Sequence, residues 1–226
     1  MRLSSLSALY LGLSLGLGLA LVPALAEDLP RVITLGGSVT EIAVELGAGD
    51  RLVGRDTTSN YPESITALPD VGYIRALSAE GVLSLAPDLI VAEGDAGPPE
   101  AVDVLRAAGV PFVLVPEATT PEGVIAKVTA VAEALGLPEA GAALTVRLEA
   151  GFAEVKAKAE AVTESRRVLF ILSLQGGRVM AAGTGTEAQG IIAIAGGINA
   201  AEGFEGYKQI ADEAVIAAAP DVILMM

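Results

Sequence analysis

Short apolar runs alternate with longer segments of helical character through the first half of the chain. The runs have strand length and are rich in Val, Ile and Leu, which is typical of strands buried on both faces of a sheet. Strands are predicted at residues 31–35, 52–54, 89–92 and 111–115, with helices at residues 38–46 and 100–108. Alternating strands and helices with short connections predict an α/β lobe with a parallel, doubly wound sheet that ends near Pro116.

Two helices then follow one another without an intervening strand. The first begins at Thr120-Pro121 and runs to about Leu135, and the second runs from Pro138 to about Val162. A helix of about 25 residues is about 37 Å long, which is more than one small lobe needs. We interpret this helix as a spine that joins two lobes, and a long helix packed on a single domain is the alternative.

A second lobe is predicted after the spine helix. It has strands at residues 167–173, 178–182 and 222–226 and a helix at residues 190–195. The predicted organisation is a signal peptide at residues 1–26, an αβ lobe at 27–118, a linker with the spine helix at 119–165, and a second αβ lobe at 166–226. Because the chain stops on a strand of buried character with no covering helix, we expect the second doubly wound lobe to be incomplete.

The end of the chain repeats an earlier segment. DVGYIRALSAEGVLSLAPDLIVAEGD (residues 70–95) and GYKQIADEAVIAAAPDVILMM (residues 206–226) share a Gly-Tyr pair, an acidic residue in a short helix, and an Ala-Pro-Asp break before an apolar strand. The matched positions include Tyr73 with Tyr207 and Glu80 with Glu213. Two related lobes, each presenting a Gly-Tyr loop, predict a ligand cleft between them.

Two predicted helix starts carry the pattern of a capping box, in which a Ser or Thr hydroxyl and a Glu or Gln side chain bond free backbone amides. Ser38 and Glu41 form the first, directly after a Gly-Gly turn, and Thr186 and Gln189 form the second. The Gly-Gly turn lacks the glycine patterns of dinucleotide sites and of P-loops, so a nucleotide site is disfavoured.

The amino terminus has the pattern of a signal peptide. Arg2 precedes an apolar run at residues 11–22, and Ala24-Leu25-Ala26 has the small-x-small form that signal peptidase cleaves. No later stretch reaches the roughly 20 apolar residues that a membrane-spanning helix needs. We therefore expect a soluble mature protein in the periplasm, without stable membrane insertion after cleavage.

The composition excludes several classes of function. The chain has no Cys and no His, which removes disulfides, thiolate metal sites, the commonest general base and every Ser-His or Cys-His arrangement. The net charge of -14 argues against nucleic acid or an anionic membrane surface as the main partner, because both need a basic face. A hydrophobic content of 52% is ample for buried cores.

Tyrosine is the best iron ligand that remains. Tyr73 and Tyr207 are the repeated pair, and Arg75 lies two residues after Tyr73. A cation beside a phenol favours the phenolate, a hard anionic ligand for ferric iron. Met180 is a weaker candidate ligand, and a tyrosine in such a loop can also be a simple packing or hydrogen-bonding group.

Three stretches of the chain resemble the periplasmic haem-binding proteins of bacterial haem ABC importers. They are VITLGGSVTEIAVELGAGDRLVG, DTTSNYPESITALPDVGYIRALSAEGVLSLAPDLIVAEGD and GTEAQGIIAIAGGINAAEGFEGYKQIADEAVIAAAPDVILMM. These proteins share a fold with the cobalamin and ferric-siderophore binding proteins, namely two αβ lobes joined by one long helix. The resemblance implies a monomeric, non-enzymatic protein that captures haem and delivers it to the ABC importer permease.

The resemblance also implies roles for individual residues. Tyr73 would be the axial ligand of the haem iron, with Arg75 near it. The resemblance does not assign the second-lobe groups that cover the other face; we suggest Tyr207 and Lys208 for them, with Lys208 binding a haem propionate. Glu80 and Glu213 would contact arginines of the permease, although either glutamate alone can equally be a solvated helix charge.

Other classes of function remain as alternatives. A cobalamin or ferric-siderophore binding protein would share the fold without needing the Tyr-x-Arg pair. An enzyme would have to use Asp, Glu or Lys as its acid and base, and no convincing carboxylate pair is visible in the sequence. A zinc or manganese binder typically needs His, so it is the least favoured alternative.

Overall fold

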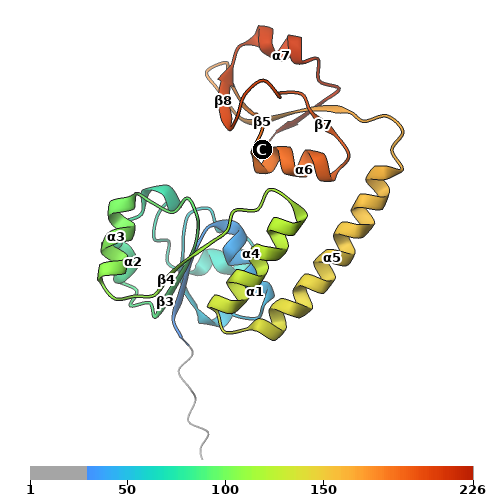
Figure 1. Cartoon of the computed structure of the whole chain (residues 1–226). Helices are drawn as coiled ribbons and strands as arrows, with labels where there is room; N and C mark the ends of the chain where they lie inside the picture. The colour runs from blue at the N-terminus through green and yellow to red at the C-terminus, as the bar shows by residue number, and fades with distance from the viewer. Residues whose placement is uncertain (1–29, 226) are drawn as a thin grey trace, which may run out of the picture.

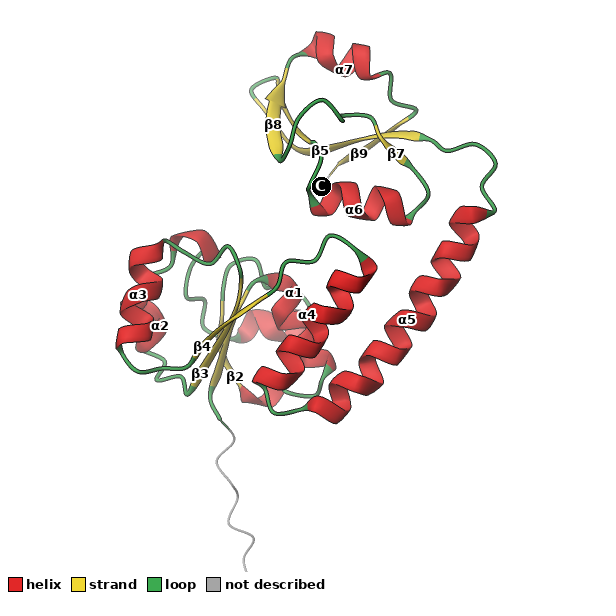
Figure 2. Cartoon of the chain, viewed as in Figure 1, coloured by secondary structure: helices red, strands yellow, loops and turns green. Residues whose placement is uncertain are grey.

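The computed structural model describes residues 30–225, so the predicted signal peptide at residues 1–26 lies outside the described residues. Two αβ lobes are joined by the long helix α5 (Pro138–Glu160), as the sequence predicts (Figures 1 and 2). With 23 residues, α5 is about 34 Å long. None of the helices in this described part is both long and apolar enough to cross a membrane.

The first lobe is a parallel, doubly wound sheet. Its strands are β1 (Val32–Leu35), β2 (Leu52–Arg55), β3 (Leu89–Glu93) and β4 (Phe112–Val115), in the order β2-β1-β3-β4. Its helices are α1 (Gly37–Glu45), α2 (Ala79–Leu83) and α3 (Pro99–Ala107), with three short 3-10 segments, η1 (Gly49–Arg51), η2 (Glu63–Ala67) and η3 (Ile74–Ala76). The strands and the helices α1 and α3 match the sequence prediction to within one residue at each end.

Neighbouring residues of each central strand face opposite cores. Val32 and Val91 pack with residues of α1 and of α4 (Pro121–Ala134), whereas Ile33 and Ile90 pack with residues of α2 and α3. Figure 1 shows these two helix pairs on opposite sides of the sheet. Burial on both faces explains why these strands appear in the sequence as continuous apolar runs rather than as alternating ones.

The second lobe has a mixed sheet. Its elements are β5 (Arg167–Gln175), β6 (Arg178–Ala182), α6 (Glu187–Ile194), β7 (Ile198–Asn199), β8 (Tyr207–Ile210), α7 (Asp212–Ala218) and β9 (Val222–Met225). The strand order is β7-β5-β6-β8, with β9 also paired to β5. β6 runs antiparallel to β5 because Gly176 and Gly177, with φ values of 58° and 75°, form a two-residue hairpin turn between them. The second lobe therefore departs from the all-parallel order of the first.

The internal repeat is present at the Ala-Pro-Asp breaks. Ala86 and Ala219 both adopt left-handed backbone angles, with φ values of 45° and 43°. The carboxylate of Asp88 accepts a hydrogen bond of 2.8 Å from the backbone N–H of Arg31, and that of Asp221 accepts one of 2.8 Å from the N–H of Arg167. Each aspartate thus links its Ala-Pro-Asp segment to the start of the neighbouring central strand.

Three details of the second half differ from the prediction. Tyr207 does not lie in a loop but begins β8, which pairs with the free edge of β6. β9 forms as predicted, yet all four of its residues are exposed because it pairs with β5 alone, whereas β3 lies between β1 and β4. Helix α6 begins at Glu187 and not at Gly190, since the capping residue Thr186 directly precedes it.

One of the two predicted capping boxes is correct. Thr186 accepts a hydrogen bond of 3.1 Å from the N–H of Gln189, and the Gln189 side chain accepts one of 2.6 Å from the N–H of Gly185. The first box is wrong, because Gly36 caps α1 without a side-chain bond and Ser38 lies inside the helix. A left-handed φ of 108° at Gly36 carries the chain from β1 into α1 and leaves the Ser38 hydroxyl available for another role.

The two lobes also meet away from α5. A Cβ atom built on Gly190 of α6 would lie 2.1 Å from the carbonyl oxygen of Thr119, in the segment between β4 and α4. Only glycine allows this approach without a clash. The contact places α6 above the start of α4 in the view of Figure 2.

Candidate functional site

A cavity of about 750 Å³ lies between the two lobes, which is within the usual size range of small-molecule sites. Its apolar lining residues are Ile42, Ala118, Val124, Val128, Leu144, Leu148 and Leu172. Its carboxylates are Glu41, Glu45, Glu93, Asp95, Glu117 and Glu187. Arg75 and Lys127 are the two cationic side chains that line it in the part of the chain that the structure describes. The site is therefore an apolar cleft that is also lined by several carboxylates and by two cationic side chains.

Arg75 connects Tyr73 to the cavity. Its Nη1 donates a hydrogen bond to the Tyr73 hydroxyl oxygen, and its Nη2 forms an ion pair with Asp95. The hydrogen bond with Tyr73 is the largest cause that raises the pKa of Arg75, and Asp95 adds to it, while partial burial acts in the opposite direction. Arg75 lines the cavity, and the 41% exposed Tyr73 lies beside it with its hydroxyl against a permanent positive charge.

The backbone around Tyr73 is held from two sides. The carbonyl of Gly72, at a φ of 99°, accepts a hydrogen bond of 3.0 Å from the N–H of Thr57. On the other side, Gly97 donates to the Ile74 carbonyl at 2.9 Å and accepts from the N–H of Leu77 at 2.8 Å. These bonds fix the 3-10 turn that follows Tyr73, so the tyrosine projects from a defined backbone rather than from a free loop.

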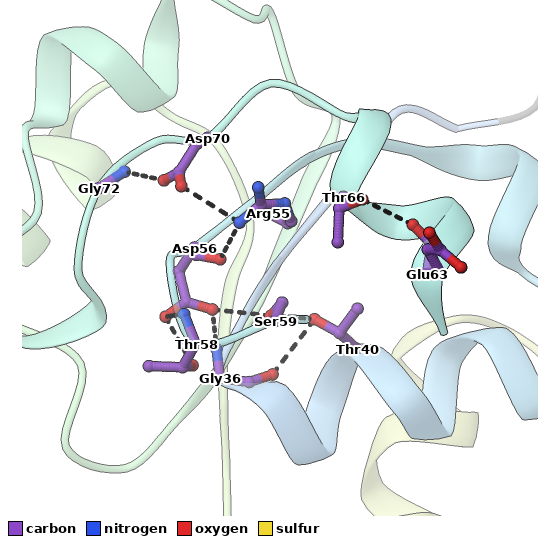
Figure 3. Close-up of polar contacts among 10 residues, drawn as sticks. All are labelled: Gly36, Thr40, Arg55, Asp56, Thr58, Ser59, Glu63, Thr66, Asp70 and Gly72. Atoms are coloured by element: carbon purple, nitrogen blue, oxygen red, sulfur yellow. Dashed lines mark hydrogen bonds and ion pairs between the residues drawn. The ribbon is translucent and has the colours of Figure 1, made fainter. Parts of the chain in front are cut away.

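A buried aspartate fixes the loop that precedes this turn (Figure 3). Asp56 is fully buried, and its Oδ1 accepts hydrogen bonds from the N–H of Gly36 at 3.0 Å and the hydroxyl of Ser59 at 2.7 Å. Its Oδ2 accepts from the N–H and the hydroxyl of Thr58 at 3.0 and 2.7 Å. The Ser59 hydroxyl also lies 2.7 Å from that of Thr40 in α1. One carboxylate thereby ties the loop after β2 to the start of α1.

Lys127 is a buried member of a polar cluster at the cavity wall that the sequence analysis missed. The residue is 9% exposed, and its Nζ donates to the Ser38 hydroxyl at 3.0 Å and lies 3.4 Å from Oε1 of Glu93. The Ser38 hydroxyl itself donates to the same Glu93 oxygen. One signal in the sequence was available, because Lys127 interrupts an apolar stripe of α4 formed by Val124, Val128 and Val131.

The second lobe contributes Leu172, Glu187 and Tyr207 to the cavity. The Tyr207 hydroxyl donates to Oε2 of Glu187 at 3.4 Å. Burial raises the pKa of Tyr207, and the neighbouring Glu187 carboxylate raises it further. The Tyr207 phenol therefore keeps its proton at neutral pH and donates it in a hydrogen bond to a carboxylate, whereas the hydroxyl oxygen of Tyr73 accepts a hydrogen bond from Arg75.

The remaining predicted site residues lie outside the cavity. Lys208 follows Tyr207 in β8, so its side chain leaves the opposite face of the strand, and its Nζ lies 5.7 Å from the centre of the Phe204 ring. Glu80 and Glu213 are exposed in the first turns of α2 and α7, one on each lobe. The structure thus brings Tyr73, Arg75 and Tyr207 to one site and does not bring Lys208 there.

Comparison with known proteins gives the family. The chain matches the periplasmic binding protein family over residues 32–226. It belongs to this family. Among solved structures, it is similar to the periplasmic heme-binding protein BhuT in complex with two hemes, with a TM-score of 0.83 and 44% sequence identity over 87% of this chain and 76% of that one.

Curated relatives match over smaller shares of their own length. The uncharacterised ABC transporter substrate-binding lipoprotein YvrC of Bacillus subtilis is 26% identical over 86% of this chain and 62% of its own length. The vitamin B12-binding protein of Yersinia pestis is 40% identical over 42% of this chain and 34% of its own length. The chain therefore spans less than two thirds of the length of these curated relatives.

Proposed function

We propose that this chain is an extracytoplasmic substrate-binding protein that captures haem and delivers it to an ABC importer permease. The observation that carries the proposal is the Arg75 guanidinium bonded to the Tyr73 hydroxyl beside the cavity between the lobes. BhuT, the heme-binding protein described above, supports haem as the ligand over most of this chain.

In this proposal the haem iron is bound by the oxygen of Tyr73. Arg75, held in place by Asp95, stabilises the phenolate that coordinates ferric iron. The macrocycle would contact the apolar walls of the cavity, formed by α1, α4 and α5. Tyr207, a protonated phenol on the other lobe, would face the ligand as a hydrogen-bonding group and not as an iron ligand. The protein catalyses no covalent reaction in this scheme.

Cobalamin is the second candidate ligand. The match to the vitamin B12-binding protein, at 40% identity over 96 residues, is the observation that favours it. A cobalamin site would share the fold without needing a tyrosine with an adjacent arginine. The two candidates therefore differ in the role that they give to Tyr73.

Titration of the mature protein with haemin and with cyanocobalamin tests the proposal. We expect saturable haemin binding with the visible spectrum of high-spin ferric haem and a charge-transfer band, and no comparable binding of cyanocobalamin. Binding of cyanocobalamin without haemin binding would overturn the haem assignment and favour the second candidate. Isothermal calorimetry in parallel would give the number of haems bound per chain.

We also propose that Glu80 and Glu213 dock the loaded protein onto the permease. Glu80→Lys combined with Glu213→Lys should reduce permease-dependent haem uptake at least about tenfold, because like charges placed opposite one another cost several kcal/mol. Haem affinity in solution should stay unchanged, since neither glutamate lines the cavity. The pair Glu149→Lys and Glu164→Lys, at exposed positions elsewhere, is the control with the same change of net charge. Equal uptake by both double variants would rule out this docking site.

A further inference from the structure

Lys127 is a buried cation at the wall of the cavity. It sits in the middle of α4 on the helix face that is otherwise apolar, and it is 9% exposed. Lysine is rarely buried to this extent unless its ammonium group is paired. Its position next to the ligand space, rather than in a sealed core, calls for a functional explanation.

The ammonium group keeps a free donor. Within residues 30–225, Lys127 bonds the Ser38 hydroxyl at 3.0 Å and Glu93 at 3.4 Å, and an ammonium group has three N–H donors. The contact with Glu93 is long for a charge-assisted hydrogen bond, which normally measures about 2.7 to 2.9 Å. An anionic ligand group in the cavity would therefore find both an unused N–H and a loosely held one.

Among the cations near the cavity, Lys127 is the one best placed to bind an anionic ligand group. Of the two cations that line it, Arg75 is already engaged with Tyr73 and Asp95. Lys208, the cation that the sequence suggested for a haem propionate, lies over Phe204 and not in the cavity. A propionate that enters a cleft lined by carboxylates needs a cation, because burying an unpaired anion is costly.

We propose that Lys127 is the residue that binds a haem propionate, and that Glu93 is the ion-pair partner of the Lys127 ammonium group in the absence of ligand. This inference depends on the proposed function, since it takes haem as the ligand. On binding, the propionate replaces Glu93 as the main partner of the ammonium group, and Ser38 keeps the lysine in position. Glu93 is then a competitor of the ligand, so its removal should favour haem.

Haem and haem dimethyl ester, which lacks the propionate charges, separate this role from a structural one. Lys127→Met should weaken haem binding about 10- to 100-fold, the range expected for one hydrogen bond to a charged group, and should change binding of the ester less than about twofold. Glu93→Gln should leave haem binding as tight or tighter and should also leave the ester unchanged. A merely structural cluster would predict equal losses for both ligands in both variants.

The double variant Glu93→Gln/Lys127→Met protects the test against misfolding, because it removes both charges of the pair together and leaves neither unpaired. Compared with Glu93→Gln, the double variant should bind haem more weakly by the same factor as Lys127→Met does relative to wild type, and should bind the ester almost unchanged. Lys158→Met, which breaks an exposed pair with Glu154 at 2.6 Å on α5, is the matched control and should change neither affinity. Equal affinities of Glu93→Gln and the double variant for haem, or equal losses for haem and ester, would overturn the role of Lys127. Failure of the wild type to bind haemin would instead count against the proposed function.

Discussion

Tyr73→Phe should lower the affinity for haem by more than about 100-fold and abolish the charge-transfer band of the ferric complex. The substitution removes one oxygen atom, which is the proposed iron ligand, and keeps the ring. Removing a group that only orients a metal ligand commonly lowers metal affinity about 10- to 100-fold, so removing the ligand itself should lower haem affinity more. The measurement is a haemin titration followed by visible absorption on wild type and variant side by side.

Two other tyrosines provide matched controls for this experiment. Tyr61 and Tyr207 line the cavity beside which Tyr73 lies, so Tyr61→Phe and Tyr207→Phe remove the same kind of atom close to the same site. Both should keep the charge-transfer band, because Tyr61 has no cation partner among the described residues and Tyr207 holds its proton beside Glu187. If the band disappeared in Tyr207→Phe and persisted in Tyr73→Phe, the iron ligand would be on the second lobe.

The first lobe could be predicted from the sequence because its central strands are buried on both faces. Runs such as Val32–Leu35 and Leu89–Glu93 are apolar at nearly every position, and glycine or proline breaks bound them. The spine helix α5 was predictable for a related reason, namely a long run of helix formers after Pro138. Local composition was sufficient for these elements.

Features that depend on distant partners could not be predicted. Ser38 matches the pattern of a helix cap, yet its hydroxyl bonds Glu93 and Lys127, which are 55 and 89 residues away. Tyr207 follows a glycine as Tyr73 does, but it lies in a strand because β8 pairs with the free edge of β6. That strand also turns Lys208 away from Tyr207, because successive side chains of a strand point to opposite faces. The two Gly-Tyr pairs therefore share a left-handed glycine, with φ values of 99° and 74°, but a 3-10 turn follows Tyr73 whereas Tyr207 begins a strand.

The Tyr73 site and the Asp56 network are parts of one structural unit. Gly72, which precedes the tyrosine, accepts a hydrogen bond from Thr57, and Thr57 adjoins Asp56. Gly72 also donates its N–H to Asp70 at 2.8 Å, and Asp70 pairs with Arg55 at 3.1 Å (Figure 3). The backbone on both sides of Asp56 thus carries the contacts that place the tyrosine.

Asp56→Ala should accordingly lower the free energy of unfolding of the first lobe by about 3 kcal/mol. The carboxylate accepts four hydrogen bonds, and its removal leaves the buried N–H of Gly36 without this partner, takes one of two partners from the buried Ser59 hydroxyl, and removes both bonds to the more exposed Thr58. Each unsatisfied buried donor costs about 1 to 3 kcal/mol, and partial rearrangement of the loop reduces the sum. Urea unfolding followed by far-UV circular dichroism measures the change.

Asp50→Ala is the control for this substitution. Asp50 lies in the short segment η1, six residues earlier, and is exposed, so its removal should change the free energy of unfolding by less than about 0.5 kcal/mol. Asp56→Asn should fall between the two, because an amide keeps one acceptor oxygen but turns an NH₂ group toward the donors of one side. The same variants should rank in the same order for haem affinity if the network positions Tyr73. A stable Asp56→Ala protein with unchanged haem binding would show instead that neighbouring segments hold this loop without the carboxylate.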